Sequence, residues 1–515
     1  MTKYIFVTGG VISGLGKGVT SASIGAILQM LGQKNITIKK LDPYLNIDPG
    51  TMNPFEHGEV YVTSDGIETD LDLGYYERFL NIETNETNST SSGKLYQKLL
   101  NNERNGDFLG KTVQMVPHFT NTVKEFICSN SNKYEYIICE IGGSVGDMEG
   151  MAFYEAIRQL RNDLGYENVL FIHLTYLVHY GITNEIKTKP TQNSIRDLQQ
   201  LGIIPEILIC RTEHLISDEI KEKLSLHTNV NKQNIIVARD VSSIYNVPIE
   251  FINDKIDEIL MKKFAIKNPI NKTKWIELNN KIISLRDSVT IGILGKYTKL
   301  NDSYKSLLES IFHAGLYHNY SVKIVWIDAR EEFNHSFENL SGVIIPGGFG
   351  MTGIETIINY ICILRVKKIP LFGICLGMQL MIIEYCRNIL GFKNSNSEEF
   401  SKGGNQVIKK IKNGCMRLGN QDIILHDSKI RNIYGKDIIT ERHRHRYIIN
   451  NETNFNNDFI ISGRSVHENN SIIETIELKD HPWYIGCQYH PEYKSSPFNP
   501  HPLFSSFIGE CISTS

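Results

Sequence analysis

The chain has 515 residues, of which 41% are hydrophobic and 22% charged, and its formal net charge is −3. This length exceeds what one hydrophobic core supports, so about two to four globular domains are expected. The slight negative charge argues against non-specific nucleic-acid binding, and no apolar run reaches membrane-spanning length. Nine scattered cysteines without a C-x-x-C pair, in a chain that opens directly on a strand pattern, favour reduced thiols and a cytoplasmic location.

The first thirty residues predict a strand, a glycine-rich loop and a helix. Residues 4–8 are apolar and β-branched, residues 9–18 contain five glycines, and residues 19–31 have helical spacing. This order aims backbone N–H groups and a helix N-terminus at phosphate, and Lys17 can reach terminal phosphates. Gly18 stands where a P-loop carries its magnesium-binding Ser or Thr, so carboxylates from elsewhere would hold a metal. A glycine-rich turn of a dinucleotide fold is the alternative.

The rest of the first half predicts a doubly wound α/β sheet. Further strands are expected at residues 36–42, 136–140, 169–174 and 206–211. Residues 46–80 show little helical periodicity and are expected to be an ordered, irregular, functional segment, whereas residues 81–92 predict a polar surface loop. Strands that alternate with helices form mainly parallel sheets with ligands at the strand C-termini.

A break near Ala265 separates the two halves. Residues 266–287 predict a linker with a helix at 275–285. A second α/β series follows, with strands expected at 289–294, 322–326, 342–346 and 371–374 and a loop at 394–405. We therefore expect domains at residues 1–265 and 288–515.

The second half carries the pattern of a cysteine nucleophile. Gly373-Ile374-Cys375-Leu376-Gly377 follows a strand and opens a helix, which is the logic of a nucleophile elbow and favours a thiolate. His490 and Glu492, two apart in an extended segment, could point into one cleft as base and orienting carboxylate. Residues 346–350 (PGGFG) predict an oxyanion nest. A buried cysteine between packing glycines is the alternative for Cys375. The combination resembles the class I glutamine amidotransferases, which release ammonia from glutamine.

Seven further segments resemble the CTP synthase family, and the likeness covers essentially the whole chain. They are residues 40–44 (KLDPY), 48–52 (DPGTM), 57–60 (HGEV), 68–74 (ETDLDLG), 140–143 (EIGG), 187–192 (KTKPTQ) and 441–447 (ERHRHRY). The resemblance implies a P-loop-like synthetase domain followed by a class I glutamine amidotransferase domain. It also implies that ATP phosphorylates O4 of UTP and that ammonia from glutamine displaces the phosphate.

The resemblance assigns site residues by position. Catalysis in the glutaminase falls to Cys375, His490 and Glu492. ATP binding falls to Ser13, Gly14, Leu15, Gly16, Lys17, Gly18, Lys40, Asp72, Arg239, Asp240 and Val241. The residues implied to bind UTP and the feedback inhibitor CTP are Ser13, Gln114, Asp147, Met148, Glu149, Lys187, Thr188, Lys189, Pro190, Thr191, Gln192 and Lys223. The residues implied to bind glutamine are Gly348, Leu376, Gly377, Met378, Gln379, Glu399 and Arg464. His57 and Val60 are implied to line the ammonia passage, and Asp72 and Glu140 to bind Mg²⁺.

The family further implies a homotetramer and activation of glutamine hydrolysis by GTP. Met351-Thr352 replaces the usual aromatic-Arg pair of the GTP-responsive lid, and the stretch between residues 400 and 416 is shortened. Three alternatives stand beside this interpretation: a solvated face for the lysines at 187–192, a cobyric-acid-type amidotransferase, and a non-catalytic, filament-forming scaffold.

Overall fold

The computed structural model describes residues 1–12, 14–182, 185–296, 298, 300–331, 337–411, 416–467 and 470–514. The chain forms two compact units, one of Met1–Thr51 with Asp72–Asn280 and the other of Met52–Leu71 with Lys281–Ser515. The second unit thus includes a segment that the sequence analysis placed in the first domain, and the units divide inside the expected connecting helix, α11 (Thr273–Ser284). In the described ranges, no helix is both long and apolar enough to span a membrane.

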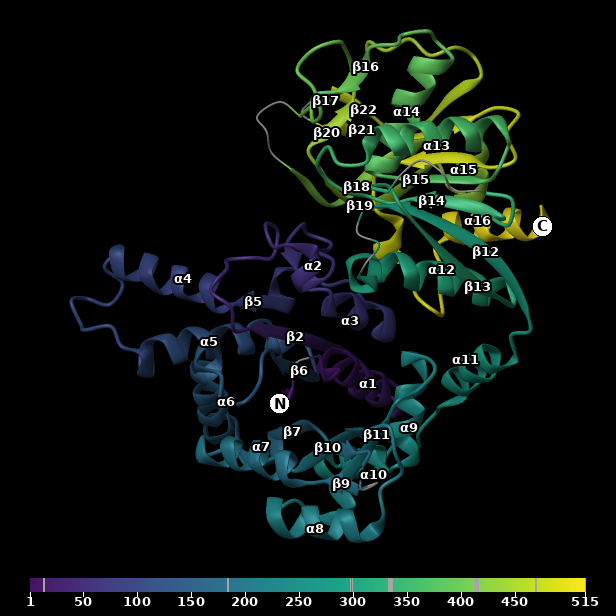
Figure 1. Cartoon of the computed structure of the whole chain (residues 1–515). Helices are drawn as coiled ribbons and strands as arrows, with labels where there is room; N and C mark the ends of the chain where they lie inside the picture. The colour runs from purple at the N-terminus through teal and green to yellow at the C-terminus, as the bar shows by residue number, and fades with distance from the viewer. Residues whose placement is uncertain are drawn as a thin grey trace. The chain divides into compact units, whose positions relative to one another are not determined.

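The first unit is built on a seven-stranded parallel sheet (Figure 1). Its order is β11 (Ile235–Arg239), β10 (Ile207–Thr212), β7 (Val169–Tyr176), β1 (Lys3–Gly9), β6 (Tyr136–Ile141), β2 (Ile36–Asp42) and β5 (Ser89–Ser91). Besides α11, the helices of this unit are α1 (Lys17–Met30), α3 (Asp72–Leu80), α4 (Ser92–Arg104), α5 (Thr120–Cys128), α6 (Met151–Leu164), α7 (Lys189–Gln200), α8 (Asp218–Thr228), α9 (Val247–Asn253) and α10 (Ile256–Phe264). A hairpin of β8 (Val178–Tyr180) and β9 (Glu185–Lys187) precedes α7.

Parallel pairing brings the ends of the central strands to one edge. β1 pairs with β6 and β7, and Lys40 of β2 is the register partner of Glu140 in β6. The strands are buried on both faces, as their near-continuous apolar runs predict. The phosphate loop after β1 therefore lies at the same sheet edge as Lys40 and Glu140.

Three expectations about irregular segments are wrong. The segment expected to be irregular ends in the helix α3, and the polar stretch 81–92 contains the buried edge strand β5. β5 tolerates polar residues where they are paired, as Ser91 Oγ donates to the Asn46 carbonyl at 2.6 Å. The expected loop at 394–405 contains the short strand β16 (Ser395–Ser397).

The second unit is built on a nine-stranded mixed sheet. Its order is β13 (Tyr320–Asp328), β12 (Asp287–Gly295), β14 (Gly342–Ile345), β15 (Leu371–Ile374), β23 (Tyr484–Cys487), β22 (Asn470–Leu478), β21 (Phe459–His467), β18 (Arg417–Leu425) and β19 (Ile438–His445). The pairs from β13 to β23 are parallel and the rest antiparallel. Smaller sheets join β16, β17 (Asn405–Lys410) and β20 (Tyr447–Ile449), and β3 (Tyr61–Val62) with β4 (Glu68–Thr69).

Helices cover both faces of this mixed sheet. One hydrophobic core includes side chains of α13 (Ile354–Val366) and α14 (Leu376–Asn388), and the other includes side chains of α12 (Lys305–His318) and α16 (Pro502–Ser513). The short helices α2 (Pro54–His57) and α15 (Lys429–Tyr434) complete the unit. Cys375 stands between β15 and α14, at the C-terminal edge of the parallel strands.

Candidate active sites

Cys375 occupies a sharp turn between β15 and α14. Its backbone angles, φ 53° and ψ −103°, lie in a region that ordinary residues rarely adopt, which is typical of strain held at a functional site. The turn is possible because a Cβ at Gly377 would overlap the Ile345 carbonyl oxygen of β14. Glycine at this position lets α14 begin directly against the sheet, with Cys375 at its N-terminus.

His490 and Glu492 meet beside this turn. His490 Nδ1 lies 2.7 Å from Glu492 Oε1, and both side chains are buried. A Cβ at Gly347 would lie 2.8 Å from His490 Cε1 and 3.6 Å from Cys375 Cβ, so this glycine sits over both residues. Burial alone would lower the pKa of His490, but the facing charges of Glu492 and Cys375 raise it to about 10. The arrangement therefore favours the protonated imidazolium form of His490.

The route to this geometry differs from the one expected. β23 ends at Cys487, and residues Pro491–Lys494 form a 3₁₀ turn rather than an extended segment. The turn, not strand alternation, brings His490 and Glu492 together, because residues in such a tight turn remain close in space.

A buried lysine and a half-buried glutamate anchor the loop at residues 346–350. Lys296 donates through Nζ to the Gly350 carbonyl and, at 3.4 Å, to that of Phe349. The Gly350 N–H donates to Glu399 Oε1 at 2.8 Å. Burial lowers the pKa of Lys296 to about 8 and raises that of Glu399. Gly348 and Glu399 were predicted as glutamine contacts and Lys296 was not, although it directly follows the strand β12, at the sheet edge where ligands bind.

The predicted glutamine residues fall into two groups. Leu376, Gly377, Met378 and Gln379 form the first turn of α14 next to Cys375. Gln379 Nε2 donates to Gln488 Oε1 at 3.0 Å and to the Tyr447 carbonyl at 3.4 Å. Arg464 of β21 instead donates to Asn451 Oδ1 and Ser471 Oγ, at 3.2 and 3.3 Å.

The segment 52–71 packs on the second unit near the catalytic turn. Tyr61 OH donates to the Tyr493 carbonyl at 3.2 Å, and Tyr493 OH donates to the Val60 carbonyl at 3.0 Å. Arg444 Nε donates to Glu68 Oε1 at 2.8 Å. Val60 is thus placed one contact from the residue after Glu492, whereas His57 is exposed at the end of α2.

In the first unit, the phosphate loop runs between β1 and α1. Gly14 and Gly16 have positive φ angles of 68° and 91°, and Gly16 caps α1. Lys17 Nζ donates to the Gly143 carbonyl at 2.7 Å, and burial lowers the pKa of Lys17. Ser13, assigned to both nucleotides, lies outside the described residues.

Three charged residues converge below this loop. Lys40 Nζ forms ion pairs with Asp72 and, at 3.0 Å, with Glu140 Oε1. Tyr76 OH donates to Glu140 Oε2 at 2.5 Å, and burial raises the pKa of Glu140. A Cβ at Gly18 would overlap Asp72 Oδ1. The Asp72 carboxylate therefore fills the space of the missing Ser or Thr, and these hard oxygen donors fit Mg²⁺.

A pocket of about 280 Å³ opens beside the phosphate loop. Arg239, Asp240 and Val241 line it together with apolar side chains, among them Val19 and Phe251. Arg211 also lines it, donates to the Leu15 carbonyl at 3.2 Å and pairs with Asp240 at 3.1 Å. Arg211 was not predicted as a site residue, although the sequence pattern puts it at the C-terminal end of an expected strand, where ligands bind.

The predicted UTP and CTP residues lie on several elements. Lys187 ends β9 and pairs with Glu185, Thr188 precedes α7, and Lys189, Pro190, Thr191 and Gln192 form its first turn. Lys223 is exposed on α8, Gln114 is exposed, and Asp147 accepts from the Ser144 N–H at 2.8 Å beside Met148 and Glu149. Within the described part of the chain, no hydrogen bond or ion pair joins Gln114 or residues 147–149 to the lysines.

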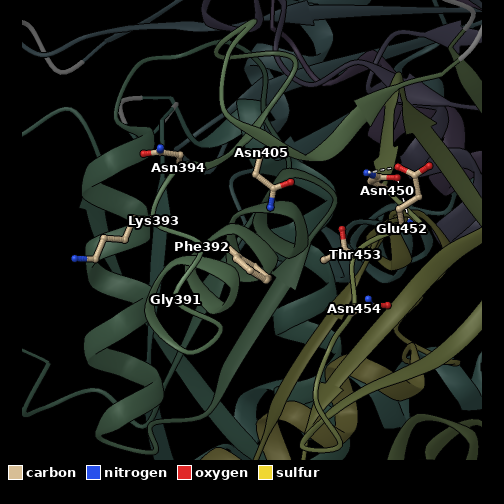
Figure 2. A pocket seen from close by; sticks show the side chains of 9 residues that line it. All are labelled: Gly391, Phe392, Lys393, Asn394, Asn405, Asn450, Glu452, Thr453 and Asn454. Carbon is tan, nitrogen blue, oxygen red and sulfur yellow. Dashed lines mark hydrogen bonds between the residues drawn. The ribbon is translucent and has the colours of Figure 1, made fainter.

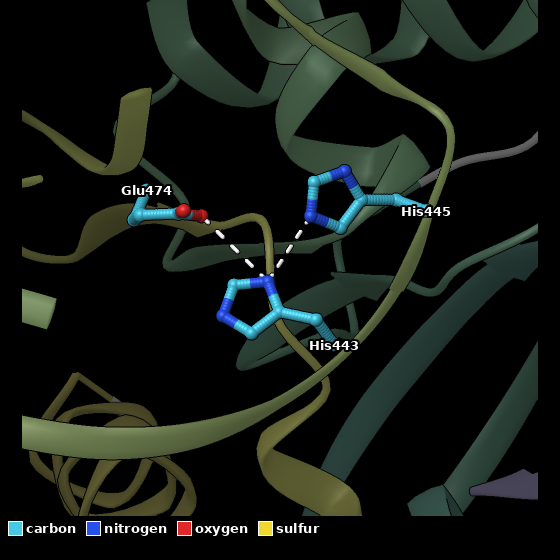
Figure 3. Close-up of side chains that lie close together, drawn as sticks. All are labelled: His443, His445 and Glu474. Carbon is cyan, nitrogen blue, oxygen red and sulfur yellow. Dashed lines mark hydrogen bonds and ion pairs between the residues drawn. The ribbon is translucent and has the colours of Figure 1, made fainter. Parts of the chain in front are cut away.

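Two further features were not predicted. Figure 3 shows His443, His445 and Glu474 buried together, with His443 Nδ1 3.1 Å from His445 Nε2 and 3.8 Å from Glu474 Oε2. Arg417 pairs with Glu474 at 2.5 Å, so a divalent cation here would meet a buried positive charge, and we assign no metal.

A polar hollow of about 670 Å³, lined by Asn394, Asn405, Asn450 and neighbours, contains no predicted site residue (Figure 2).

Both halves of the chain match known protein families. The family model "CTP synthase N-terminus" matches residues 3–266, and "Glutamine amidotransferase class-I" matches residues 299–509. A CTP synthase of Hydrogenobaculum sp. is 49% identical over 98% of this chain and 97% of its own length. A CTP synthase of Pelagibacter ubique is 48% identical over 99% of each chain. These matches exclude the cobyric-acid-type alternative, and the chain belongs to the CTP synthase family.

Proposed function

We propose that the two sites divide the family's reaction, the ATP-dependent amination of UTP to CTP with glutamine as nitrogen donor. The catalytic triad is the observation that supports this proposal most directly. Cys375 lies on a strained turn beside His490, and His490 Nδ1 lies 2.7 Å from Glu492 Oε1, which orients the ring. His490 takes the proton of Cys375, and the thiolate attacks the side-chain amide of glutamine. His490 then protonates the departing ammonia, and water hydrolyses the thioester to glutamate.

Substrate recognition in the second unit follows from the contacts of Gln379. Both hydrogens of its Nε2 are engaged, by Gln488 and by the Tyr447 carbonyl. The atom that remains for a substrate is its Oε1, an acceptor that suits the ammonium group of glutamine. Gly348, Leu376 and Glu399 border the same thiol or its anchored loop, and we propose that Arg464 binds the substrate carboxylate.

In the first unit, we propose that the glycine-rich loop and Lys17 hold the ATP phosphates and that Lys40 neutralises charge on the transferred group. Arg211, Arg239, Asp240 and Val241 line the 280 Å³ pocket and would surround the adenine base there. Asp72 and Glu140 would hold Mg²⁺, whose charge would offset that of the phosphates. Lys40 lies between these two carboxylates in the structure and would share them with the metal.

UTP binds, on this proposal, at the basic N-terminus of α7 through Lys187 to Gln192, with Lys223 and Gln114. The helix N-terminus and three lysines suit a triphosphate. Asp147, Met148 and Glu149 would recognise CTP as feedback inhibitor.

Assembly and regulation complete the proposal. We propose a homotetramer in the cytoplasm, where cysteines stay reduced. GTP would activate glutamine hydrolysis, although Met351 and Thr352 stand where an aromatic-Arg pair is usual. Ammonia would pass by Val60 and His57, which belong to the same unit as the triad.

One variant separates the two sites. Cys375→Ala removes the nucleophile, so glutamine-dependent CTP formation should vanish while synthesis from ammonium salt continues near the parental rate and rises with pH, because neutral ammonia is the nucleophile. Absorbance-monitored UTP conversion measures both rates. Lys17→Ala, the control, should fail on both nitrogen sources, by about 10²–10³-fold. A Cys375→Ala protein that still used glutamine would refute the assignment.

A further inference from the structure

Gln488 is completely buried between the nucleophile and a predicted substrate residue. Its Nε2 lies 3.5 Å from Cys375 Sγ, within hydrogen-bonding range for sulfur. Its Oε1 accepts from Gln379 Nε2 at 3.0 Å. No step of the glutaminase reaction described above uses this side chain, although it touches the reacting atom.

The direction of the hydrogen bonds follows from a fixed acceptor. The Tyr447 carbonyl can only accept, so the group of Gln379 that faces it at 3.4 Å must be the amide nitrogen. The second hydrogen of that nitrogen then points to Gln488, which must offer its oxygen. The Gln488 nitrogen is thereby turned toward Cys375, and the sulfur faces an N–H donor rather than an acceptor.

The sulfur has a different partner when it is protonated. Cys375 Sγ lies 3.8 Å from the Arg444 carbonyl, which can accept from a thiol but repels a thiolate. Gln488, in contrast, donates to the sulfur and so binds the charged form more strongly than the neutral one. The two contacts act in opposite directions on the ionisation of one atom, and the N–H contact is the shorter.

We propose that Gln488 is a catalytic residue of the glutaminase that stabilises the Cys375 thiolate, with Gln379 as the positioning residue that fixes the orientation of its amide. This deepens the proposed function and rests on it. Negative charge is present on the sulfur twice in the cycle. It forms when His490 takes the thiol proton before the C–S bond is made, and it returns when water has attacked the thioester and the C–S bond breaks. In both states the N–H of Gln488 is already in place.

The test is the pH dependence of Cys375 alkylation, followed by mass spectrometry after timed exposure to iodoacetamide. Gln488→Met keeps a similar volume but removes the donor. We expect the pH midpoint of alkylation to rise by roughly one to two units and the rate below the midpoint to fall about ten- to hundred-fold, as for loss of a hydrogen bond to a charged group. Gln488→Glu keeps the acceptor for Gln379 but places an anion beside the sulfur, and should shift the midpoint further.

Internal controls separate this effect from misfolding. Alkylation of Cys362, on α13, should be unchanged in the same digests, and ammonia-dependent CTP synthesis should persist. Gln379→Met should give a smaller upward shift, since Gln488 would then be free to rotate. An unaltered midpoint in both Gln488 variants would overturn the proposal, whereas failure of Cys375→Ala to abolish glutamine use would overturn the proposed function instead.

Discussion

At the scale of single residues, Gly18 and Asp72 compete for one small volume beside the phosphate loop. A Cβ at residue 18 would overlap Asp72 Oδ1, and this carboxylate also pairs with Lys40. The missing hydroxyl at position 18 is therefore a geometric consequence of using a carboxylate from α3.

We expect Gly18→Ser to abolish CTP synthesis from both glutamine and ammonia, because the new side chain displaces Asp72 from Lys40 and from the phosphates. Glutamine hydrolysis, measured as glutamate release, should remain. Gly403→Ala is the matched control, since nothing lies within 4 Å of a Cβ there. A Gly18→Ser protein that synthesised CTP normally would show that Asp72 is not needed at this position.

At the scale of elements, a buried hydrogen-bonded chain ties β1 and β7 to α7. Thr8 Oγ1 lies 2.8 Å from His173 Nδ1, and His173 Nε2 lies 2.8 Å from Ser194 Oγ. Ser194 in turn fills the space that a side chain at Gly10 would need. The helix that begins with the proposed UTP residues is thereby joined to the phosphate loop.

The buried His173 in this hydrogen-bonded row predicts that acid destabilises the first unit. Burial and the charge of Lys17 lower the pKa of His173 to about 3, below the value of about 6.5 expected in the unfolded chain. The unfolded state therefore binds more protons between these values, and stability is lost as the pH falls from about 6.5 toward 3.

His173→Gln should remove this dependence. Relative to pH 7.5, the parental protein should lose about 2 kcal/mol more of its free energy of unfolding at pH 5 than the variant does, by this group alone. Urea unfolding followed by circular dichroism at both pH values provides the measurement. The exposed control His227→Gln should behave like the parent, and parallel pH profiles for His173→Gln and the parent would contradict the assignment.

At the scale of the whole molecule, residues 52–71 leave the first unit and complete the second. Tyr61 is fully buried there, stacks edge-on against Tyr493 at 4.9 Å between ring centroids, and accepts a hydrogen bond from Arg442 at 3.1 Å. A segment from the synthetase half of the sequence thus supports the 3₁₀ turn after β23, where His490 and Glu492 lie.

Tyr61→Ala should therefore damage the glutaminase although it lies outside the amidotransferase sequence. We expect a loss of about 3–5 kcal/mol in the stability of the second unit, as for other buried aromatic truncations, and a reduced rate of glutamine hydrolysis. The fluorescence of Trp326 and Trp483, both in this unit, reports its unfolding in urea. Tyr317→Ala, at a 60% exposed position of α12, is the control; equal effects of the two variants would exclude a special role for the segment.

The sequence by itself determined the two α/β series, the turn around Cys375 and the family to which the chain belongs. These features are local: β-branched runs, glycines at fixed offsets and motifs a few residues long bias the chain wherever it folds. Only the tertiary structure decided that residues 52–71 join the second unit, that Lys40 lies between Asp72 and Glu140, and that Gln488 faces the thiol. Such contacts depend on sheet order and side-chain direction across hundreds of residues, and no local pattern encodes which distant groups will share one small volume.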